Sequence, residues 1–198
     1  LRVATSSSAK APLRDGARRA VVAVLRAAAL GLLPETERPY LRRFRLFDDA
    51  FCVTSTVPEL PMFEVSGAET DDLGRLLEAL LAGERLRKQS GMYYTPRLVV
   101  DDVVSRAVMP FTTPEKSLPR IVDPACGGGA FLFGIARALE ATRGGTTSVE
   151  FRRALFEGLH GFDIEPLAVA VSELSLAIWA GAHRDDAPGF NYVCPGGL

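Results

Sequence analysis

Apolar residues recur at helical spacing in the first ninety residues of the chain. Asp15 is placed to cap a helix that runs to about Leu33, and Pro34 follows it. A second, shorter helix is predicted from Glu35–Arg38 into the forties. A third helix is predicted over Leu73–Lys88. It follows acidic residues and has its leucines on one face, which is typical of an amphipathic helix.

The second half of the chain follows a different pattern, in which short apolar strands alternate with helices. The predicted order is helix Leu98–Val108, strand Arg120–Asp123, helix Ala130–Ala141, helix Ser148–Glu157, strand Leu159–Asp163 and helix Pro166–Ala180. Apolar strands joined through helices predict a parallel sheet with right-handed crossovers. Ligands of such sheets bind at the carboxyl ends of the strands, where Asp123 and Asp163 fall.

These two patterns divide the chain into regions. We expect residues 1–12 to be disordered, because they are small and polar, and residues 13–90 to form a helical region. Residues 91–198 then form the α/β core.

Composition excludes several classes of protein. No apolar run approaches the roughly 20 residues that span a bilayer, and the N-terminus shows no signal-peptide pattern. Cys52, Cys126 and Cys194 are widely spaced and form no Cys-x-x-Cys pair, which argues against disulfides and a zinc site. We therefore expect a cytoplasmic protein without a structural metal.

Charge is unevenly distributed along the chain. Residues 1–50 hold ten Lys and Arg against five Asp and Glu, and aromatic residues interrupt the arginines Arg42, Arg43 and Arg45. Such interleaving suits phosphate contact and base stacking on nucleic acid. The alternative is a solvated, arginine-rich helix face with no ligand.

Three short motifs carry the candidate chemistry. Residues Ile121–Leu132 read as a strand, a tight glycine turn and the start of a helix. Glycines at such a turn let backbone approach a ligand closely, although a lone glycine-rich loop is a weak signal. Gly91–Pro96, with its Tyr-Tyr-Thr-Pro sequence, precedes this turn, and Leu159–Pro166, with Gly-Phe-Asp-Ile-Glu-Pro, follows it.

Together the three motifs resemble the S-adenosylmethionine-binding half of the N6-adenine DNA methyltransferases. The likeness is greatest to modification subunits of type I restriction systems and to fused type II restriction–methylation enzymes. It covers roughly residues 88–183. The resemblance implies a class I S-adenosylmethionine-dependent methyltransferase fold, Rossmann-like with a mostly parallel sheet, of which this chain holds an incomplete part.

The resemblance also implies a set of cofactor-binding residues. By position, Asp163 would accept hydrogen bonds from the ribose hydroxyls, and Ile164 would cover one face of the adenine. Thr95 would help hold the cofactor's carboxylate with Tyr94 packed nearby, and the methionine portion would be surrounded by Asp123, Ala125, Cys126, Gly127 and Gly129.

Each of these assignments has an alternative. Asp163 could instead cap the helix that begins at Pro166, and Tyr94 could be an ordinary core aromatic. The glycine turn lacks the lysine that usually completes a phosphate-binding loop. Cys126 invites comparison with a catalytic cysteine, but its place inside the turn makes a nucleophilic role improbable.

The motif that presents the target base is missing. N6-adenine methyltransferases carry an Asn/Asp-Pro-Pro-Tyr/Phe tetrapeptide that orients the amine of a flipped adenine, and these residues contain none. No catalytic residue is therefore predicted, and we expect the 198 residues alone to be inactive.

Two functions remain open at this point. The first is the cofactor-binding portion of a DNA adenine N6-methyltransferase of a restriction–modification or related defence system. Its partners would be DNA and a specificity subunit or a further C-terminal domain. The alternative is a stand-alone S-adenosylmethionine-binding protein derived from that family, either non-catalytic or acting on a small molecule.

Overall fold

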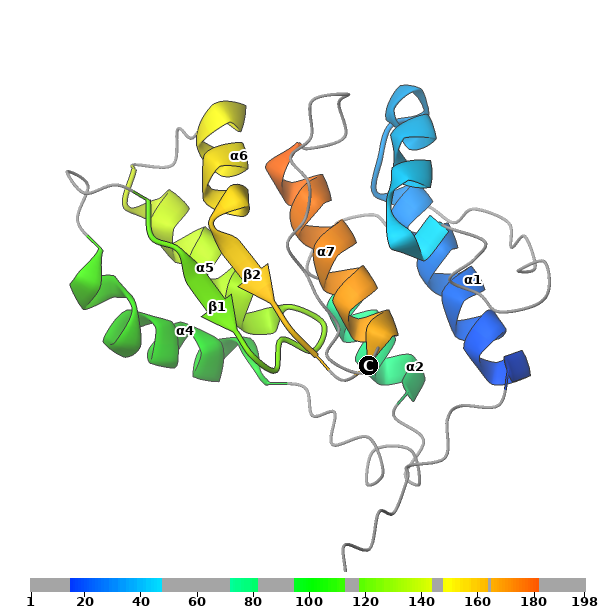
Figure 1. Ribbon diagram of the computed structural model, residues 1–198, viewed down its shortest axis with the longest axis horizontal. Coiled ribbons are helices and arrows are strands. Elements are labelled where there is room, and N and C mark those ends of the chain that lie inside the picture. Colours follow the sequence, from blue (N-terminus) through cyan, green and yellow to red (C-terminus); the bar gives the residue numbers. More distant parts are fainter. Residues whose placement is uncertain are drawn as a thin grey trace, which may run out of the picture.

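The computed structural model describes residues 15–47, 72–81, 95–112, 118–143, 148–163 and 165–181 (Figure 1). Within these residues the chain forms a two-stranded parallel sheet and a set of helices that pack beside it. The expected alternation of strand and helix is confirmed for the second half of the chain. None of the described helices is both long enough and apolar enough to cross a membrane.

The N-terminal part is helical, as predicted. Helix α1 spans Asp15–Gly31, the 3-10 helices η1 and η2 span Glu35–Arg43 and Arg45–Phe47, and helix α2 spans Asp72–Leu81. The second predicted helix is thus of the tighter 3-10 type, with Pro39 inside it. For the third, the residues expected to continue the helix beyond Leu81 lie outside the described part.

The core elements fall close to their predicted positions. In chain order they are helix α4 (Arg97–Ala107), the 3-10 helix η4 (Met109–Phe111), strand β1 (Ile121–Asp123), helix α5 (Ala130–Ala141), helix α6 (Val149–Glu157), strand β2 (Leu159–Gly161) and helix α7 (Pro166–Ala180). The Ser148 hydroxyl accepts a hydrogen bond from the amide of Phe151 and so caps α6.

The two strands pair in parallel, with Ile121 opposite Leu159 and Asp123 opposite Gly161. Strand β2 ends at Gly161, so the prediction that it runs to Asp163 is wrong by two residues. Pairing does not stop there, because the amide of Phe162 still donates to the carbonyl of Asp123 at 2.8 Å. At Asp163 the chain turns toward α7, and no strand residue remains opposite it.

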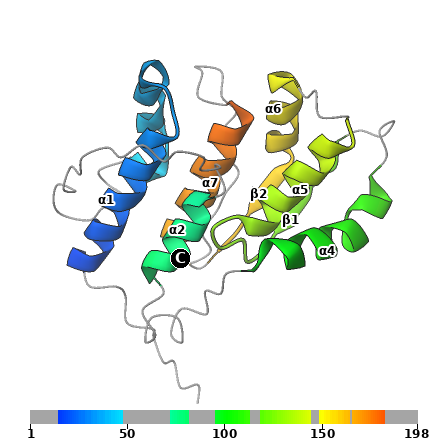
Figure 2. The same cartoon turned by 180° about the vertical axis from the view of Figure 1, so that it is seen from behind.

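Helix α7 lies at the centre of the molecule, between the sheet and α1, and α2 covers it on the face seen in Figure 2. Almost all of its residues are buried, which is expected of a helix that is apolar on every side. A single apolar core runs from α1 to α7 and includes Leu25, Leu77, Phe133 and Leu174. The N-terminal helices therefore pack on the same core as the sheet.

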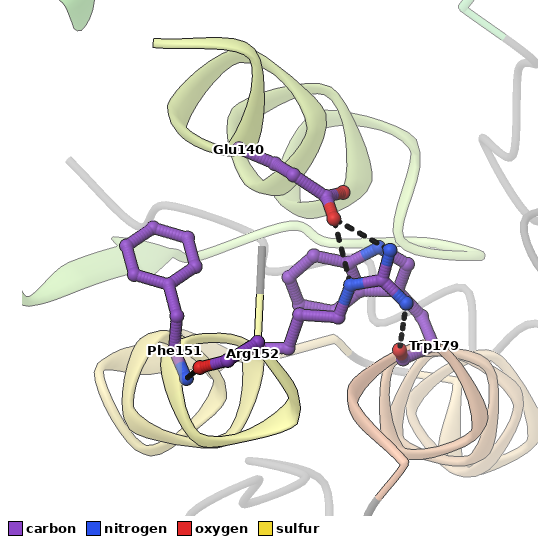
Figure 3. Close-up of polar contacts among 5 residues, drawn as sticks. Glu140, Phe151, Arg152 and Trp179 are labelled. Atoms are coloured by element: carbon purple, nitrogen blue, oxygen red, sulfur yellow. Dashed lines mark hydrogen bonds and ion pairs between the residues drawn. The ribbon is translucent and has the colours of Figure 1, made fainter. Parts of the chain in front are cut away.

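A polar contact joins three helices at the edge of this core (Figure 3). Arg152 of α6 donates from Nε to the carboxylate of Glu140 on α5 at 2.7 Å, and from Nη1 to the carbonyl of Trp179 on α7 at 3.5 Å. Its guanidinium also lies over the Trp179 ring. This contact holds the helices that flank the sheet in a fixed arrangement.

Candidate functional site

The glycine turn after β1 adopts a conformation that its sequence makes possible. Gly127 and Gly129 have φ angles of 52° and 92°, in the left-handed region that side chains disfavour. The amide of Gly129 donates to the carbonyl of Cys126 at 2.8 Å, which closes the turn, and α5 begins at the next residue. The unpaired amides of the first turn of α5 thus lie at the carboxyl edge of the sheet.

Asp163 connects this turn to the end of β2. Its Oδ2 accepts a hydrogen bond from the amide of Gly127 at 2.9 Å, and its Oδ1 accepts one from the amide of Glu165, also at 2.9 Å. The cap of α7 is Glu165, whose carboxylate accepts from the amide of Leu167 at 3.1 Å. Asp163 therefore supports the entry to α7 while its other oxygen faces the glycine turn.

Asp123, at the end of β1, is the second carboxylate at this edge. It accepts a hydrogen bond from the amide of Ala125 at 3.0 Å. Burial raises the pKa of Asp123, and the nearby charge of Asp163 raises it further, while the bond from Ala125 opposes this rise. The two carboxylates make the edge electronegative.

Cys126 is part of the turn, and its side chain is buried. Burial raises the pKa of its thiol to about 12, and the charges of Asp163 and Asp123 add to the effect. Because the thiolate is the nucleophilic form, a thiol with this pKa is unreactive at neutral pH. Burial and this raised pKa therefore argue against a nucleophilic role for Cys126.

Helix α2 contributes two residues that sequence reasoning missed. Gly74 packs directly on the turn, since a Cβ added to it would lie 2.4 Å from the carbonyl oxygen of Gly128. One turn along the helix, Glu78 Oε1 lies 3.9 Å from the position of a Cβ on Gly127. A glycine inside an amphipathic helix is itself a sign of close packing, and this signal was present in the sequence.

Glu78 is half-buried, and burial raises the pKa of its carboxyl from 4.5 to about 7. Its Oε2 is buried and accepts no hydrogen bond from the part of the chain that the structure describes. A small cleft opens beside it, lined by Gly74, Arg75, Glu78, Arg97, Val100, Gly128, Ala130 and Arg137.

The remaining predicted residues are placed as follows. Thr95 is half-buried two residues before α4, and Ala125 is exposed within the turn. Tyr94 and Ile164 lie outside the described residues, as do the side chains of Arg43 and Arg45, while Arg42 is exposed on η1. The nucleic-acid role of these arginines stays a prediction. Across the described ranges, no three His, Cys, Asp or Glu residues are grouped so that they could hold a metal ion.

Comparison with known proteins bears on this site. The profile of a family described as N-6 DNA Methylase matches residues 68–186, which is more than half of the chain. The chain is 32% identical over 124 residues to the adenine-specific methyltransferase PglX of Streptomyces coelicolor, a match that covers 59% of this chain and 10% of that protein. It therefore spans about a tenth of the length of this relative.

A solved structure also matches. It is that of a modification subunit assigned to a type I restriction enzyme from Vibrio vulnificus YJ016, with 31% sequence identity and a TM-score of 0.37. The match covers 55% of this chain and 21% of the other.

Proposed function

Because the chain belongs to the N-6 DNA methylase family, we propose that it binds S-adenosylmethionine at the carboxyl edge of its sheet, in a class I methyltransferase fold. The chain would then supply the cofactor-binding portion of a DNA adenine N6-methyltransferase. A restriction–modification or related defence system is the setting that the family suggests.

The observation that carries this proposal is the position of Asp163. A carboxylate at the end of the second strand faces a turn built from left-handed glycines, and it already accepts a hydrogen bond from Gly127. A carboxylate at the end of a strand is the kind of acceptor that the hydroxyls of a ribose require, and the bond from Gly127 fixes its orientation beside the turn.

Charge at the edge favours this ligand over a phosphate. Asp123 and Asp163 both lie beside the turn, and a phosphate at the N-terminus of α5 would meet their negative charge. S-adenosylmethionine carries a sulfonium and an α-ammonium, which two carboxylates attract. The residues present therefore fit a cationic nucleoside better than a nucleotide.

Each residue has a defined task in this proposal. Asp163 holds the ribose, and Asp123 and the backbone of Ala125–Gly129 surround the methionine portion. Thr95 lies beside α4 to bind the carboxylate of the cofactor. When bound, S-adenosylmethionine supplies the methyl group, and the protein's contribution here is to hold and orient that donor.

Presentation of the adenine requires residues other than these. The 198 residues contain no Asn-Pro-Pro-Tyr-like tetrapeptide, and the chain spans about 10% of the length of PglX. We propose that the base-orienting residues, the principal DNA contacts and any specificity subunit belong to further sequence or to a partner. The cysteine pattern keeps a cytoplasmic location as our expectation.

Isothermal titration with S-adenosylmethionine tests the cofactor site. Asp163→Ala should weaken binding by about 1.5–3 kcal/mol, as expected when charge-assisted hydrogen bonds are lost. Asp102→Asn is a matched control, because Asp102 is an exposed carboxylate on α4 paired with Arg106. Equal affinity of wild type and Asp163→Ala would contradict the assignment of Asp163.

Methyl transfer distinguishes the two functional classes. A tritium-transfer assay on mixed-sequence DNA should show no N6-methyladenine with the 198 residues alone, and activity when a further segment or a partner that carries an Asn-Pro-Pro-Tyr-like motif is added. Cofactor binding without methylation in either case would favour the stand-alone binding protein. Robust methylation by the 198 residues alone would show that other residues present the base.

A further inference from the structure

Glu78 lies near the glycine turn, and the proposed function gives it no task. It comes from α2, in the N-terminal helical region, and not from the three motifs that define the family resemblance. The contact between Gly74 and Gly128 leaves no room for a side chain between α2 and the turn. Glu78 is therefore held at the turn by backbone packing and not by a flexible linker.

The environment of Glu78 is unfavourable for the protein without a ligand. Its Oε2 is buried, and no group in the described ranges donates a hydrogen bond to it. A buried carboxyl oxygen without a donor costs free energy that a native fold normally avoids. Such an oxygen beside a ligand-binding turn is well placed to receive a donor from the ligand itself.

The cleft beside Glu78 has the charges of an amino-acid binding site. Arg97 of α4 and Arg137 of α5 line the same cleft as Glu78, and so does Ala130, the first residue of α5. The carboxylate of a free amino acid suits the arginines, and its ammonium suits Glu78. The methionine end of S-adenosylmethionine carries both groups on one carbon atom.

We propose that Glu78 accepts a hydrogen bond from the α-ammonium of the S-adenosylmethionine methionine portion, so that helix α2 forms part of the cofactor site. This inference rests on the proposed function. It extends the site beyond the three motifs and makes the N-terminal helices a direct participant in binding.

A consequence for protonation follows. With a pKa of about 7, Glu78 is largely protonated at about pH 6 without ligand, and a bound ammonium would favour its ionised form. Binding at this pH should therefore release protons, and affinity should rise as the pH increases toward 7. The ligand's own amine stays protonated in this range, since α-amino groups titrate near 7.7–8.0.

Charged groups on the elements that pack near Glu78 must be considered in this titration. The described ones on its own helix and on the elements packed around it are Arg75 of α2, Arg26 of α1, Arg97 of α4, Arg137 of α5, the buried Glu173 of α7, and Asp123 and Asp163 beside the turn. Asp123 has a raised pKa and could also release protons, so only the difference between wild type and a Glu78 variant isolates Glu78.

The test is isothermal titration of the 198-residue chain with S-adenosylmethionine at about pH 6. Two buffers of different ionisation enthalpy give the number of protons released. Glu78→Gln keeps the shape of the side chain but cannot ionise. It should weaken binding roughly tenfold or more and should remove the proton release due to Glu78.

A matched control is Glu157→Gln. Glu157 is exposed at the end of α6, directly before β2, and so lies at the opposite end of the strand from the turn. This variant should bind like wild type and release the same number of protons. Far-UV circular dichroism and thermal melting of both variants confirm that the fold is retained.

S-adenosylhomocysteine identifies the group that Glu78 contacts. It keeps the α-ammonium but lacks the sulfonium charge, so Glu78→Gln should weaken it by the same factor as S-adenosylmethionine. A loss confined to S-adenosylmethionine would place the sulfonium at Glu78 and overturn the assignment to the ammonium.

The remaining outcomes separate this inference from the proposed function. Unchanged affinity and proton release in Glu78→Gln, with Asp163→Ala still impaired, would overturn the role of Glu78 and leave the cofactor site standing. A wild-type chain that binds no S-adenosylmethionine would overturn both.

Discussion

The glycine turn is held on its two sides by different kinds of contact. On the side of β2, the carboxylate of Asp163 accepts a hydrogen bond from Gly127, and this polar contact can be shared with a ligand. On the side of α2, the backbones of Gly74 and Gly128 touch with no side chain between them. The first contact can rearrange when a ligand binds, whereas the second has no part that can move independently.

This difference predicts where the molecule tolerates change. Losing a hydrogen-bonding partner in a half-exposed site costs mainly that interaction, and water can replace it. Adding an atom between two packed backbones forces the helix or the turn to move, because a close-packed interior does not yield locally. We therefore expect the Asp163 side to determine ligand affinity and the α2 side to determine stability.

The largest expected effect is that of Gly74→Ala. In an exposed helix this substitution would stabilise by about 1 kcal/mol, but here the new Cβ would lie 2.4 Å from the Gly128 oxygen. We expect a net loss of roughly 2–4 kcal/mol in the free energy of unfolding, measured by urea denaturation.

Its control is Ala79→Gly at an exposed position of the same helix, which should cost only about 0.5–1 kcal/mol through helix propensity. If Gly74→Ala proved more stable than wild type, the backbone contact between α2 and the turn would be refuted.

A smaller contrast is expected between two glycines of the turn itself. A Cβ on Gly129 would lie 2.6 Å from Ser172 Oγ of α7, whereas a Cβ on Gly127 would meet nothing nearer than Glu78 Oε1 at 3.9 Å. Gly127→Val should therefore cost about 1–2 kcal/mol of left-handed backbone strain and leave the fold largely intact. It should nevertheless abolish S-adenosylmethionine binding.

Gly129→Val should lower the free energy of unfolding by about a further 1–3 kcal/mol, because the new side chain would also clash with α7. Thermal melting in parallel with calorimetric titration compares the two variants. Equal destabilisation would mean that the turn is not packed against α7, and undiminished affinity in Gly127→Val would make the turn a purely structural feature.

The smallest effect concerns pH and Glu78. Its pKa is raised in the folded chain from 4.5 to about 7, so the folded state binds a proton more tightly than the unfolded state. The associated stability is fully present below about pH 4.5 and is lost as the pH rises through about 7. Solvent screening limits the effect to roughly 1 kcal/mol for a half-buried group.

The difference in unfolding free energy between Glu78→Gln and wild type measures this term directly. The variant should gain stability relative to wild type between about pH 5 and pH 8 in the absence of ligand. A difference that stays constant with pH would show that burial does not perturb Glu78.

Local patterns in the sequence were sufficient to place most of the core elements. Helix Ala130–Ala141 and helix Pro166–Ala180 begin and end where glycine, proline and apolar spacing predicted. The error at the end of β2 arose because the apolar character of Phe162 continues the strand pattern, whereas β1 ends at Asp123 and the chain beyond it forms the glycine turn. Such signals are local and can be read from neighbouring residues.

The contact between Gly74 and Gly128 could not be predicted in the same way. The two residues are far apart in the sequence, and nothing in either segment specifies the other. The role of Glu78 shares this difficulty, since its raised pKa depends on what α2 packs against and not on its own helix. Sequence motifs identified the turn, but tertiary packing decides which other segments reach it.

The buried thiol of Cys126 can report when the glycine turn opens. With a pKa of about 12, only roughly one molecule in a hundred thousand carries the thiolate at pH 7, and burial excludes a reagent even from that fraction. Alkylation of Cys126 should therefore proceed only when the turn separates from α7 and exposes the sulfur. With Cys52 and Cys194 replaced by serine, the rate of Cys126 alkylation would measure how often the turn opens. Slower alkylation at saturating ligand would show that the ligand keeps the turn closed for longer.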